Sequence, residues 1–433
     1  MRVIRGSLFL KQSFCMLWIA LLVIIPDAKV SAQNVSQPVS AEDKAYLEGL
    51  YKDTWGYLST HVDAITGLPY DASSRQPPTS MSNVGLYLAS VSTAYRTGLI
   101  SAVDAEQRVK KVLDSLEKVD KWKGIPRPWI ITRTLAPTFG DEFTYGPHLS
   151  ALIGGLLVTQ ATFPEIVFEG IVPRIRKMLT VMELKTLYDP KTGWLKGGYN
   201  VKQDNFAIFQ SWGHWYYKHF ASETRLLSYY LILRGAAPKE HWFSLIRSKQ
   251  QLEGETFFVS GYEEGGLYVQ FLSGLFLDER ATEMGESQKG YVNYQMKHAQ
   301  TIKSPVWGWS SCLTPQGRYL AYGELRDDIV APYASILAVH YYPAEVIKNL
   351  RALEEKGARP ESHPRFGEVH FGFLDSINWQ TGDTAKHYLT PNQAMAFLSL
   401  ANYLHDGIVW KSFSESLPLQ QQLTDVSVSK PAV

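Results

Sequence analysis

Cysteine is nearly absent from this chain of 433 residues, which contains only Cys15 and Cys312. Cys15 lies in an apolar N-terminal segment that we expect to be removed, so an intrachain disulfide is not expected. No cysteine-based zinc pattern occurs, and the metalloprotease motif H-E-x-x-H is also missing. We therefore expect a protein that relies on a large hydrophobic core and uses neither a metal nor another cofactor.

Several catalytic motifs are missing as well. The chain has no P-loop, and no G-x-G-x-x-G follows a predicted strand, which argues against nucleotide chemistry. G-x-S-x-G does not occur, so a serine hydrolase is not expected. The formal net charge is +1, from 43 basic and 42 acidic residues, and this balance argues against nucleic acid as a partner. Catalysis by carboxylate side chains is the class of chemistry that these absences leave open.

Long apolar runs are missing after residue 32. Before it, Arg2, Arg5 and Lys11 accompany the apolar run FCMLWIALLVII, and a small-residue site, VSA, ends at Ala32. This three-part pattern is typical of a secretory signal peptide and is too short for a convincing membrane span. We expect residues 1–32 to be a signal peptide and the protein to be exported. The alternative is an uncleaved N-terminal anchor.

Aromatic residues, by contrast, are plentiful, with 12 Trp and 24 Tyr. Their side chains combine a broad apolar face with a polar group, and sugar-binding clefts use both properties. A tyrosine-rich core is the alternative explanation for many of them. Aromatic content therefore indicates glycan binding only in combination with other features.

Apolar residues recur at helical spacing along most of the chain after residue 40. Pro147, Pro332, Pro343 and Pro391 stand where helices would begin, which is a position that favours proline. We predict an all-α fold of roughly ten to twelve helices with few strands. Alternating helices and decorated loops suit a helical toroid, although the count alone does not exclude a solenoid. The expected helices cover residues 41–62, 80–100, 101–119, 146–163, 167–184, 223–233, 287–302, 331–342, 343–357 and 391–407.

The amino-acid composition is uniform between residues 41 and 413, without a linker, charge block or low-complexity tract. We therefore predict a single domain over 41–413. Residues 33–40 are polar and residues 414–433 lack a periodic apolar face, so both are predicted to be flexible ends.

Among the acids, Glu223 has the most unusual setting. At helical spacing it shares a face with Leu226, Leu227 and Tyr230. A carboxylate on a face that should be buried is costly unless it is paired or functional. Desolvation raises the pKa of such an acid and suits it to proton donation near neutral pH. The alternative is a structural glutamate paired with a basic side chain. The candidates for that pairing are His219, Arg225 and Arg234.

Glycoside hydrolysis needs a second carboxylate, acting as a base or a nucleophile. Asp141 and Glu142 lie in a loop just before a predicted helix, although such acids are often solvated turn residues. Asp327 and Asp328 also precede a helix, where they favour its N-terminus or could bind sugar hydroxyls. Weaker candidates in turn-like settings are Asp189, Asp204, Glu263, Glu264 and Asp375.

Several stretches occur together in a recognisable order: LYDPKTGWLKGGYN, HFASETRLLSYYLILRGAAPKEHWFSL, SPVWGWSSCLTPQGRY, LRDDIVAPYASILAV, FGFLDSINW and LTPNQAMAFLSLANYLHDGIVW. They resemble the glucoamylase-like domain family, found in bacterial endo-β-1,2-glucanases and in part of cyclic β-1,2-glucan synthases. The earlier stretch TSMSNVGLYLASVSTAYRTGLIS is similar to the start of that domain. The resemblance runs from about Thr79 to Trp410.

The resemblance implies an (α/α)6 toroid whose aromatic- and acid-rich loops line a glycan-binding cleft. It also implies an exported bacterial protein, either periplasmic or secreted. In that family a Ser/Asn-Glu pair precedes a leucine-rich helix, and its glutamate lies in the cleft; the pair falls on Ser222 and Glu223 here. The family's Asp-Gly-x-x-x-Pro stretch falls on Asp327, Asp328 and Pro332.

The sequence departs from the family at positions that face its cleft. Ile131 and His148 stand where the family carries acids, and its Asp-Gln-Gly near the C-terminus becomes Asn392-Gln393-Ala394. We hypothesise that Asp141 or Glu142 supplies the missing carboxylate.

We therefore predict a glycoside hydrolase that acts on an oligo- or polysaccharide, a β-glucan, with β-1,2-glucan as the first choice. Glu223 would be the acid or base, partnered by Asp141 or Glu142. The alternatives are a non-catalytic glycan-binding protein, suggested by Ile131 and His148, and a polysaccharide lyase with His148 or a tyrosine as base. The residues predicted to bind substrate are His148, Trp194, Tyr199, Trp215, Trp307, Trp309, Arg326, Asp327, Asp328, Asp375 and Trp379.

Overall fold

Helices dominate the described part of the chain, as the apolar periodicity predicts. The computed structural model describes residues 39–73, 78–138, 140–206, 215–260, 266–320 and 326–417. These residues fall within one compact unit, Pro38–Val433. The predicted signal peptide lies outside the described residues. Among the helices that are described, none is long and apolar enough to cross a membrane.

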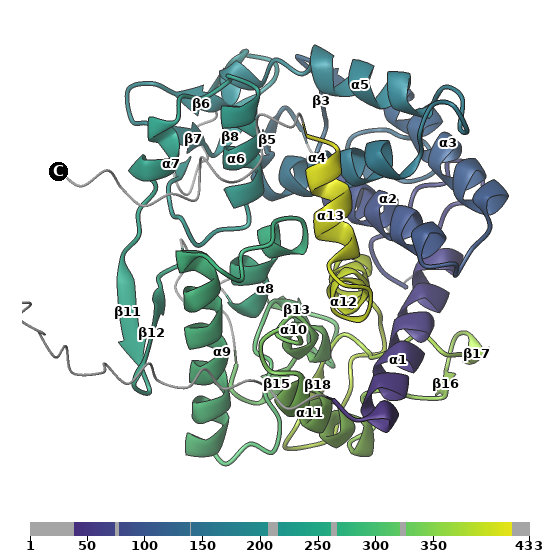
Figure 1. Cartoon of the computed structure of the whole chain (residues 1–433), viewed down its shortest axis with the longest axis vertical. Helices are drawn as coiled ribbons and strands as arrows, with labels where there is room; N and C mark the ends of the chain where they lie inside the picture. The colour runs from purple at the N-terminus through teal and green to yellow at the C-terminus, as the bar shows by residue number, and fades with distance from the viewer. Residues whose placement is uncertain are drawn as a thin grey trace, which may run out of the picture. The chain divides into compact units, whose positions relative to one another are not determined.

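Six helices form an inner ring, in which each contacts the next except the third and fourth, which are joined through a residue just beyond the fourth (Figure 1). The contact between the third and fourth is a hydrogen bond from the Leu226 N–H to the Ser273 hydroxyl (3.0 Å), just beyond the fourth helix. The last helix returns to the first and closes the ring. The inner helices are α2 (Met81–Arg96), α4 (Gly146–Thr162), α6 (Arg225–Leu233), α8 (Gly266–Phe271), α10 (Pro332–Ile336) and α12 (Thr390–Leu404).

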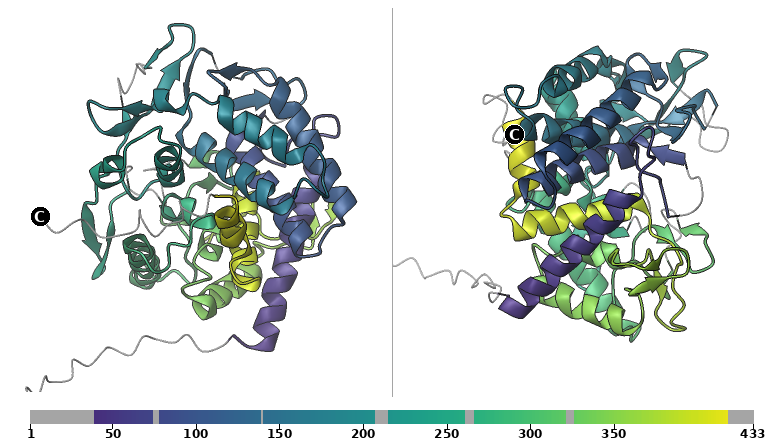
Figure 2. Two further views of the ribbon diagram at one scale, coloured as in Figure 1. Left: turned by 45° about the horizontal axis from the view of Figure 1, so that its top comes forward. Right: turned by 90° about the vertical axis from the view of Figure 1, so that its right-hand side faces the viewer.

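Six further helices lie outside this ring, and each packs on one inner helix. The first of them packs on α12, so the two ends of the ring meet, as the views in Figure 2 also show. This closure confirms the predicted (α/α)6 toroid and distinguishes it from an open solenoid. The outer helices are α1 (Ala41–Thr60), α3 (Ala102–Lys118), α5 (Ile171–Val181), α7 (Glu240–Ser244), α9 (Glu283–Thr301) and α11 (Pro343–Glu355).

The two rings differ in their apolar patterns. The inner helix α4 is buried on nearly every side and carries apolar or small residues almost throughout. The outer helix α3 buries only one stripe, which includes Val109, Val112 and Leu116, and exposes its charged face. A helix that is apolar all round belongs in the interior, and an amphipathic one belongs at the surface. The sequence pattern therefore assigns each helix to its ring.

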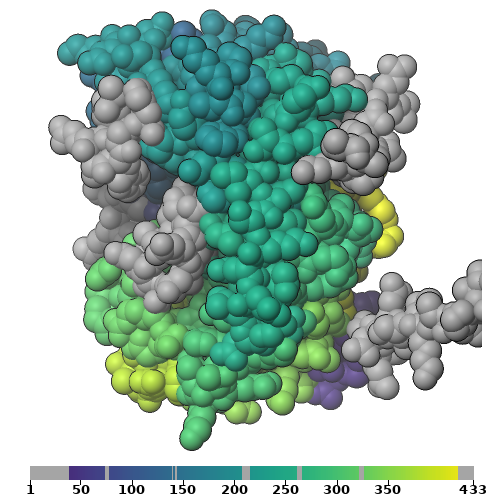
Figure 3. Space-filling view, turned by 90° about the vertical axis from the view of Figure 1, so that its left-hand side faces the viewer, coloured from purple at the N-terminus to yellow at the C-terminus, as the bar shows by residue number. Residues whose placement is uncertain are grey.

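The loops between the helices carry short strands of two to four residues. They form small antiparallel sheets, including β5-β8-β9 and β10-β7-β6. The hairpin of β11 and β12 covers α9 on the face shown in Figure 3. The strands are β1 (Pro78–Ser80), β2 (Lys121–Trp122), β3 (Ile125–Pro126), β4 (Trp129–Ile131), β5 (Glu142–Thr144), β6 (Tyr188–Asp189), β7 (Trp194–Lys196), β8 (Gly198–Asn200), β9 (Asn205–Phe206), β10 (Tyr216–Tyr217), β11 (Lys249–Leu252), β12 (Glu255–Phe258), β13 (Cys312–Leu313), β14 (Tyr319–Leu320), β15 (Ile329–Val330), β16 (Ser362–His363), β17 (Gly367–Glu368) and β18 (Ile377–Asn378).

The boundaries of some elements differ from the expectation. The helix predicted from Glu223 begins two residues later, at Arg225, so Glu223 lies in a turn and not on a helix face. The short helices α7 and α8 and the C-terminal helix α13 (Ile408–Glu415) were not predicted. Two single turns of 3-10 helix, η1 (Leu184–Leu187) and η2 (Ser273–Leu275), complete the described helical elements.

Helices α2 and α4 approach each other closely at two glycines. A Cβ atom on Gly155 would lie 1.9 Å from the carbonyl oxygen of Gly85, and one on Gly85 would lie 2.2 Å from that of Ala151. Both distances are below any real Cβ contact with backbone. The inner ring therefore requires glycine at this crossing.

Gly155→Ala should push α2 and α4 apart and lower the free energy of unfolding by about 3 kcal/mol, the upper range for overpacking a core. Gly49→Ala is the matched control, because that glycine lies in the helix α1 and a Cβ there meets nothing within 4 Å. It should be neutral or stabilise by up to about 1 kcal/mol. Urea titrations of both variants give the comparison, and equal effects would contradict the close approach.

Candidate active site

The N-terminal ends of several inner helices meet through direct contacts. The Ser82 hydroxyl of α2 lies 2.8 Å from Nδ1 of His148 in the first turn of α4. The N–H of Thr390, which begins α12, donates to the carbonyl oxygen of Asp71 (2.8 Å), and the Asp71 carboxylate accepts from the Asn83 amide of α2 (2.7 Å). Free N–H groups and the helix dipole make such ends suitable for binding oxygen-rich ligands.

Glu223 lies beside the same group of helix ends. It precedes Thr224, the residue before α6, and a Cβ at Gly146 in α4 would come within 2.6 Å of the Thr224 methyl group. The Glu223 side chain is 1% exposed. Neither of its carboxylate oxygens has a hydrogen-bond partner among the described residues.

Burial controls the protonation of Glu223. Loss of hydration raises the pKa of its carboxyl group to about 7, against a smaller opposing effect from its own backbone and from the Arg225 charge. Near neutral pH the group therefore exchanges between its acid and carboxylate forms. A proton donor with this pKa is well matched to general acid catalysis at neutral pH.

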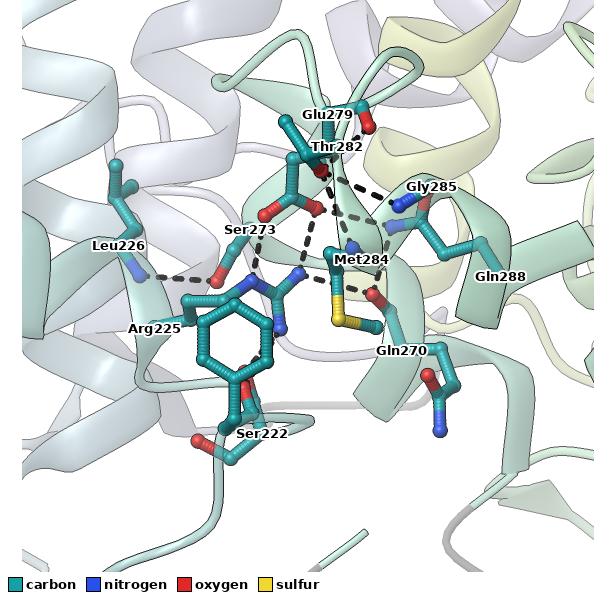
Figure 4. Close-up of polar contacts among 12 residues, drawn as sticks. Ser222, Arg225, Leu226, Gln270, Ser273, Glu279, Thr282, Met284, Gly285 and Gln288 are labelled. Atoms are coloured by element: carbon teal, nitrogen blue, oxygen red, sulfur yellow. Dashed lines mark hydrogen bonds and ion pairs between the residues drawn. The ribbon is translucent and has the colours of Figure 1, made fainter. Parts of the chain in front are cut away.

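The alternative in which Glu223 is a paired structural residue does not describe this site. Arg225 binds Glu279 instead, with its Nε 2.5 Å from Oε1 and a terminal nitrogen 2.6 Å from Oε2 (Figure 4). Within the described part of the chain, neither His219 nor Arg234 forms a hydrogen bond with the Glu223 carboxylate. The sequence feature that could have indicated a buried, paired Arg225 is its position at the start of the otherwise apolar run RLLSYYL.

His148 is held by two hydrogen bonds. The indole N–H of Trp129 donates to its Nε2 (3.2 Å), and Nδ1 faces Ser82. Because an indole only donates, Nε2 is unprotonated and the ring proton sits on Nδ1. Burial also lowers the His148 pKa to about 4, so the ring is neutral at pH 7. Its one basic nitrogen is thus already occupied by Trp129.

The segment before α4 contains the two predicted partner carboxylates. The Asp141 side chain is 51% exposed and lies 4.0 Å from the Arg127 guanidinium. Glu142 begins β5, opposite Asn200, but its side chain lies outside the described residues. Ile131 ends β4 and is 45% exposed, so it faces solvent and not the core.

A second buried acid, Asp375, lies near the start of α12. Its carboxylate accepts from the Asn392 amide (2.7 Å) and from the Leu313 N–H (2.5 Å). Burial raises the pKa of Asp375 to about 7, and the nearby charge of Asp71 adds to this effect. Burial raises the pKa of Asp71 as well. Asp71 was not predicted as a buried acid of this group. The sequence feature that could have indicated it is an acid within the apolar turn GLPYDA.

Tyr319 is a further titratable residue near this second group. Its side chain is 52% exposed, yet loss of hydration strongly raises the pKa of its hydroxyl. Asp375 and Asp71 contribute further to that rise.

Five of the predicted substrate-binding residues lie together. The Asp327 carbonyl oxygen accepts from the indole N–H groups of Trp309 (3.2 Å) and Trp379 (2.6 Å). The Asp328 carboxylate binds the Arg326 guanidinium through two hydrogen bonds (2.9 and 2.5 Å). The 66% exposed Asp327 carboxylate lies 2.9 Å from His298. Trp309 itself is buried, so the cluster offers the partly exposed Trp379 ring with charged groups near it.

The remaining predicted residues occupy varied positions. Trp194 is partly exposed, and its indole donates to the Ser244 carbonyl (3.1 Å). Trp215 packs edge-on to Tyr217, with ring centroids 4.5 Å apart. Trp307 is buried, and the hydroxyl of the buried Tyr199 donates to the Thr186 carbonyl. Their roles in binding stay predictions. Of the weaker candidates, Glu263 and Glu264 lie outside the described residues.

Glu223→Gln should stabilise the protein in a pH-dependent manner. Below about pH 4.5 the acid is protonated in both states, so the substitution has little effect. Between about pH 4.5 and pH 7 the unfolded chain loses the proton that the folded chain keeps, so wild-type stability falls. Above pH 7 the variant should exceed the wild type by about 3 kcal/mol. Urea titrations across this range test it, with the exposed Glu345→Gln as control; parallel curves would contradict the assignment.

Comparisons with known proteins agree with this architecture. Residues 221–417 match the family described as "putative glucoamylase", and residues 50–150 match a family described as protein of unknown function. The cyclic β-(1,2)-glucan synthase NdvB of Rhizobium meliloti is 25% identical over 258 residues. That match covers 54% of this chain but spans only 8% of the length of NdvB.

Solved structures resemble nearly the whole chain. A putative glucoamylase of Bacteroides fragilis aligns with a TM-score of 0.74 and 19% identity, covering 91% of this chain and 100% of its own. The endo-β-1,2-glucanase of Chitinophaga pinensis gives 0.72 and 18%, covering 90% and 98%. The endo-β-1,2-glucanase of Talaromyces funiculosus gives 0.64 and 11%, covering 87% and 85%. At these identities the likeness establishes the fold. Residues 221–417 thus resemble the glucoamylase-like family, as the ordered motifs predict, and the whole chain shares the fold of these structures.

Proposed function

We propose that the protein is an exported glycoside hydrolase that cleaves a β-glucan, with β-1,2-glucan as the first substrate to test and Glu223 as the catalytic acid. The observation that carries the proposal is the Glu223 carboxyl group, which is buried beside the ends of the inner helices, has no hydrogen-bond partner in the described ranges, and has a pKa raised to about 7. A buried acid without a partner costs stability, so a functional role accounts for it best.

In this mechanism Glu223 donates its proton to the glycosidic oxygen as the bond to the leaving sugar breaks. A second carboxylate activates water or attacks the sugar directly. Asp141 is the first candidate for this role, because its exposed carboxylate is available to water while Arg127 lies 4.0 Å away. Glu142 is the alternative in the same segment. Trp379 and the Asp327–Asp328 pair would hold the sugar rings, with the buried Trp309 supporting the Asp327 carbonyl.

The known proteins support the choice of substrate. Two structural neighbours are named endo-β-1,2-glucanases, and their crystals hold sophorotriose with glucose or sophorose. The curated relative is named a cyclic β-(1,2)-glucan synthase. A chain that shares their fold and the family's sequence pattern is a reasonable candidate for the same glycan. The N-terminal signal pattern would place it in the periplasm or outside the cell.

The lyase alternative is less well supported by the site. The basic nitrogen of His148 already accepts a hydrogen bond from Trp129, and its pKa is lowered to about 4. A base that removes a sugar proton needs a free lone pair near neutral pH. A non-catalytic glycan-binding role is the second candidate, favoured by Ile131 at the exposed end of β4.

Incubation with linear β-1,2-glucan should release reducing ends, and Glu223→Gln should lower kcat by about 10²–10⁴-fold, as expected for loss of a general acid. Activity should fall as the pH rises above about 7, because Glu223 must carry its proton to act. Glu345→Gln should retain activity, since this exposed residue lies in the first turn of α11. Unsaturated, ultraviolet-absorbing products would indicate a lyase. Binding without products would indicate a glycan-binding protein and would sink the hydrolase proposal.

Asp141→Asn and Glu142→Gln separate the two candidate partners. The variant that removes the true second carboxylate should lose activity about as severely as Glu223→Gln, whereas the other should keep most of it. Adding azide to the inactive variant tests the assignment further, because a small anion can replace a missing carboxylate. If both variants hydrolyse glucan at the wild-type rate, the partner lies elsewhere and Asp375 becomes the next residue to test.

A further inference from the structure

The Arg225 guanidinium, two residues after Glu223, is fully buried and fully hydrogen-bonded (Figure 4). Its Nε and one terminal nitrogen bind the two carboxylate oxygens of Glu279. That terminal nitrogen also donates to the Gln270 carbonyl (3.1 Å), and the other donates to two further carbonyls. All five N–H groups of an arginine are thereby used. A buried ion pair of this kind is rarely gained for stability alone.

Two of these hydrogen bonds hold the turn that carries Glu223. The second terminal nitrogen of Arg225 donates to the carbonyl oxygens of Phe220 (3.2 Å) and Ser222 (3.1 Å). The Ser222 carbonyl carbon is bonded directly to the nitrogen of Glu223, so Arg225 fixes the peptide plane from which the acid projects. The Ser222 hydroxyl, 2.9 Å from the Thr224 hydroxyl, braces the same turn.

Glu279 reaches this turn from a distant part of the chain. It lies between η2 and α9, 54 residues after Arg225. Its Oε2 also accepts from the Gln288 amide of α9 (3.0 Å), and that amide donates to the Gln270 carbonyl of α8 as well (3.0 Å). The anchor of the turn is therefore two neighbouring helices and not the loop itself.

The pair also controls the charge beside Glu223. Arg225 is the charged group that acts on the Glu223 carboxyl, and it favours the ionised form. On the other elements nearby, His148 of α4 is neutral at pH 7 and Tyr217 of β10 is a phenol. Glu279 supplies the opposite charge within the same network, which limits the field of Arg225 at Glu223.

We propose that the Arg225–Glu279 pair is a positioning device for Glu223: it fixes the peptide that carries the acid, and the Glu279 carboxylate offsets part of the positive charge that favours loss of the acid's proton. The catalytic half of this inference rests on the proposed role of Glu223 as proton donor. Two substitutions separate the positioning half of the proposal from its charge half. Arg225→Lys changes the geometry at constant charge, and Glu279→Gln changes the charge at nearly constant shape.

Arg225→Lys keeps the charge but loses the planar fork that binds Glu279 and both turn carbonyls. With β-1,2-glucan as substrate, kcat should fall at least about tenfold while KM stays within about twofold, because only the placement of the acid changes. The alkaline limb of the pH–rate profile should stay in place. An unchanged kcat in folded protein would overturn the positioning half.

Glu279→Gln leaves Arg225 uncompensated, so the pKa of Glu223 should fall and the alkaline limb should move to lower pH by about one unit. Glu279→Asp keeps the charge and should leave the limb close to its wild-type position. The matched control is Glu354→Gln, which removes one carboxylate from the distant Arg359 ion pair and should leave the limb unmoved. A Glu279→Gln limb that coincides with the wild type would overturn the charge half.

A measurement without substrate separates this inference from the hydrolase proposal. The stability gained through Glu223→Gln, followed by urea titration from pH 4 to pH 9, reports the pKa of Glu223 directly. In the Glu279→Gln background this gain should be smaller and should saturate at lower pH. If wild-type protein cleaves no glucan but the gain responds in this way, the hydrolase proposal fails while the charge coupling stands. If the gain is the same in both backgrounds, the coupling fails even in an active enzyme.

Discussion

The closed ring of inner helices is the constraint on which the rest of the structure depends. Because helices such as α2 and α4 are buried on nearly every side, little of their length is left to bind a ligand. Their ends are different, since the first turn of each helix leaves N–H groups unpaired. The polar residues Ser82, His148 and Asn392 accordingly lie in the first turns of three inner helices. Burial thus confines the chemistry of the toroid to the helix ends and their loops.

Glu223 and Asp375 are both carboxyl groups buried away from water, but they differ in their hydrogen bonds. Burial raises the pKa of both carboxyl groups to about 7. Asp375 is compensated by hydrogen bonds from Asn392 and Leu313, whereas Glu223 has none from the described residues. The hydrogen bonds hold the Asp375 carboxylate in one place, which suits a structural or binding role. An uncompensated acid can release its proton to a ligand.

The helices were easier to predict from the sequence than the contacts around Glu223. Helices depend on residues close together in the sequence, whereas those contacts join residues far apart in it. Helical periodicity is local, so the toroid followed from apolar spacing and from the ordered family motifs. Glu223 was identified, but it was placed on a helix that in fact begins at Arg225, because the Ser222 turn has no strong breaker. The pairing of Arg225 with Glu279 joins residues 54 positions apart, and no local pattern reports such a contact. Asp71 was missed for the same reason, since its neighbour Thr390 is more than three hundred residues away.

The family departures at Ile131 and His148 acquire a physical meaning from these contacts. At His148, where the resemblance implies an acid, Trp129 and Ser82 hold a neutral ring in one tautomer, so the position makes hydrogen bonds but carries no charge at pH 7. Ile131 replaces an acid with an exposed apolar group. Among the described residues, Arg225 is the charged side chain that acts on the Glu223 carboxyl, whereas the Asp71 carboxylate acts on Asp375. A single well-isolated proton donor keeps a pKa near 7 more easily than one surrounded by other carboxylates, whose coupled titrations would spread its proton over several sites.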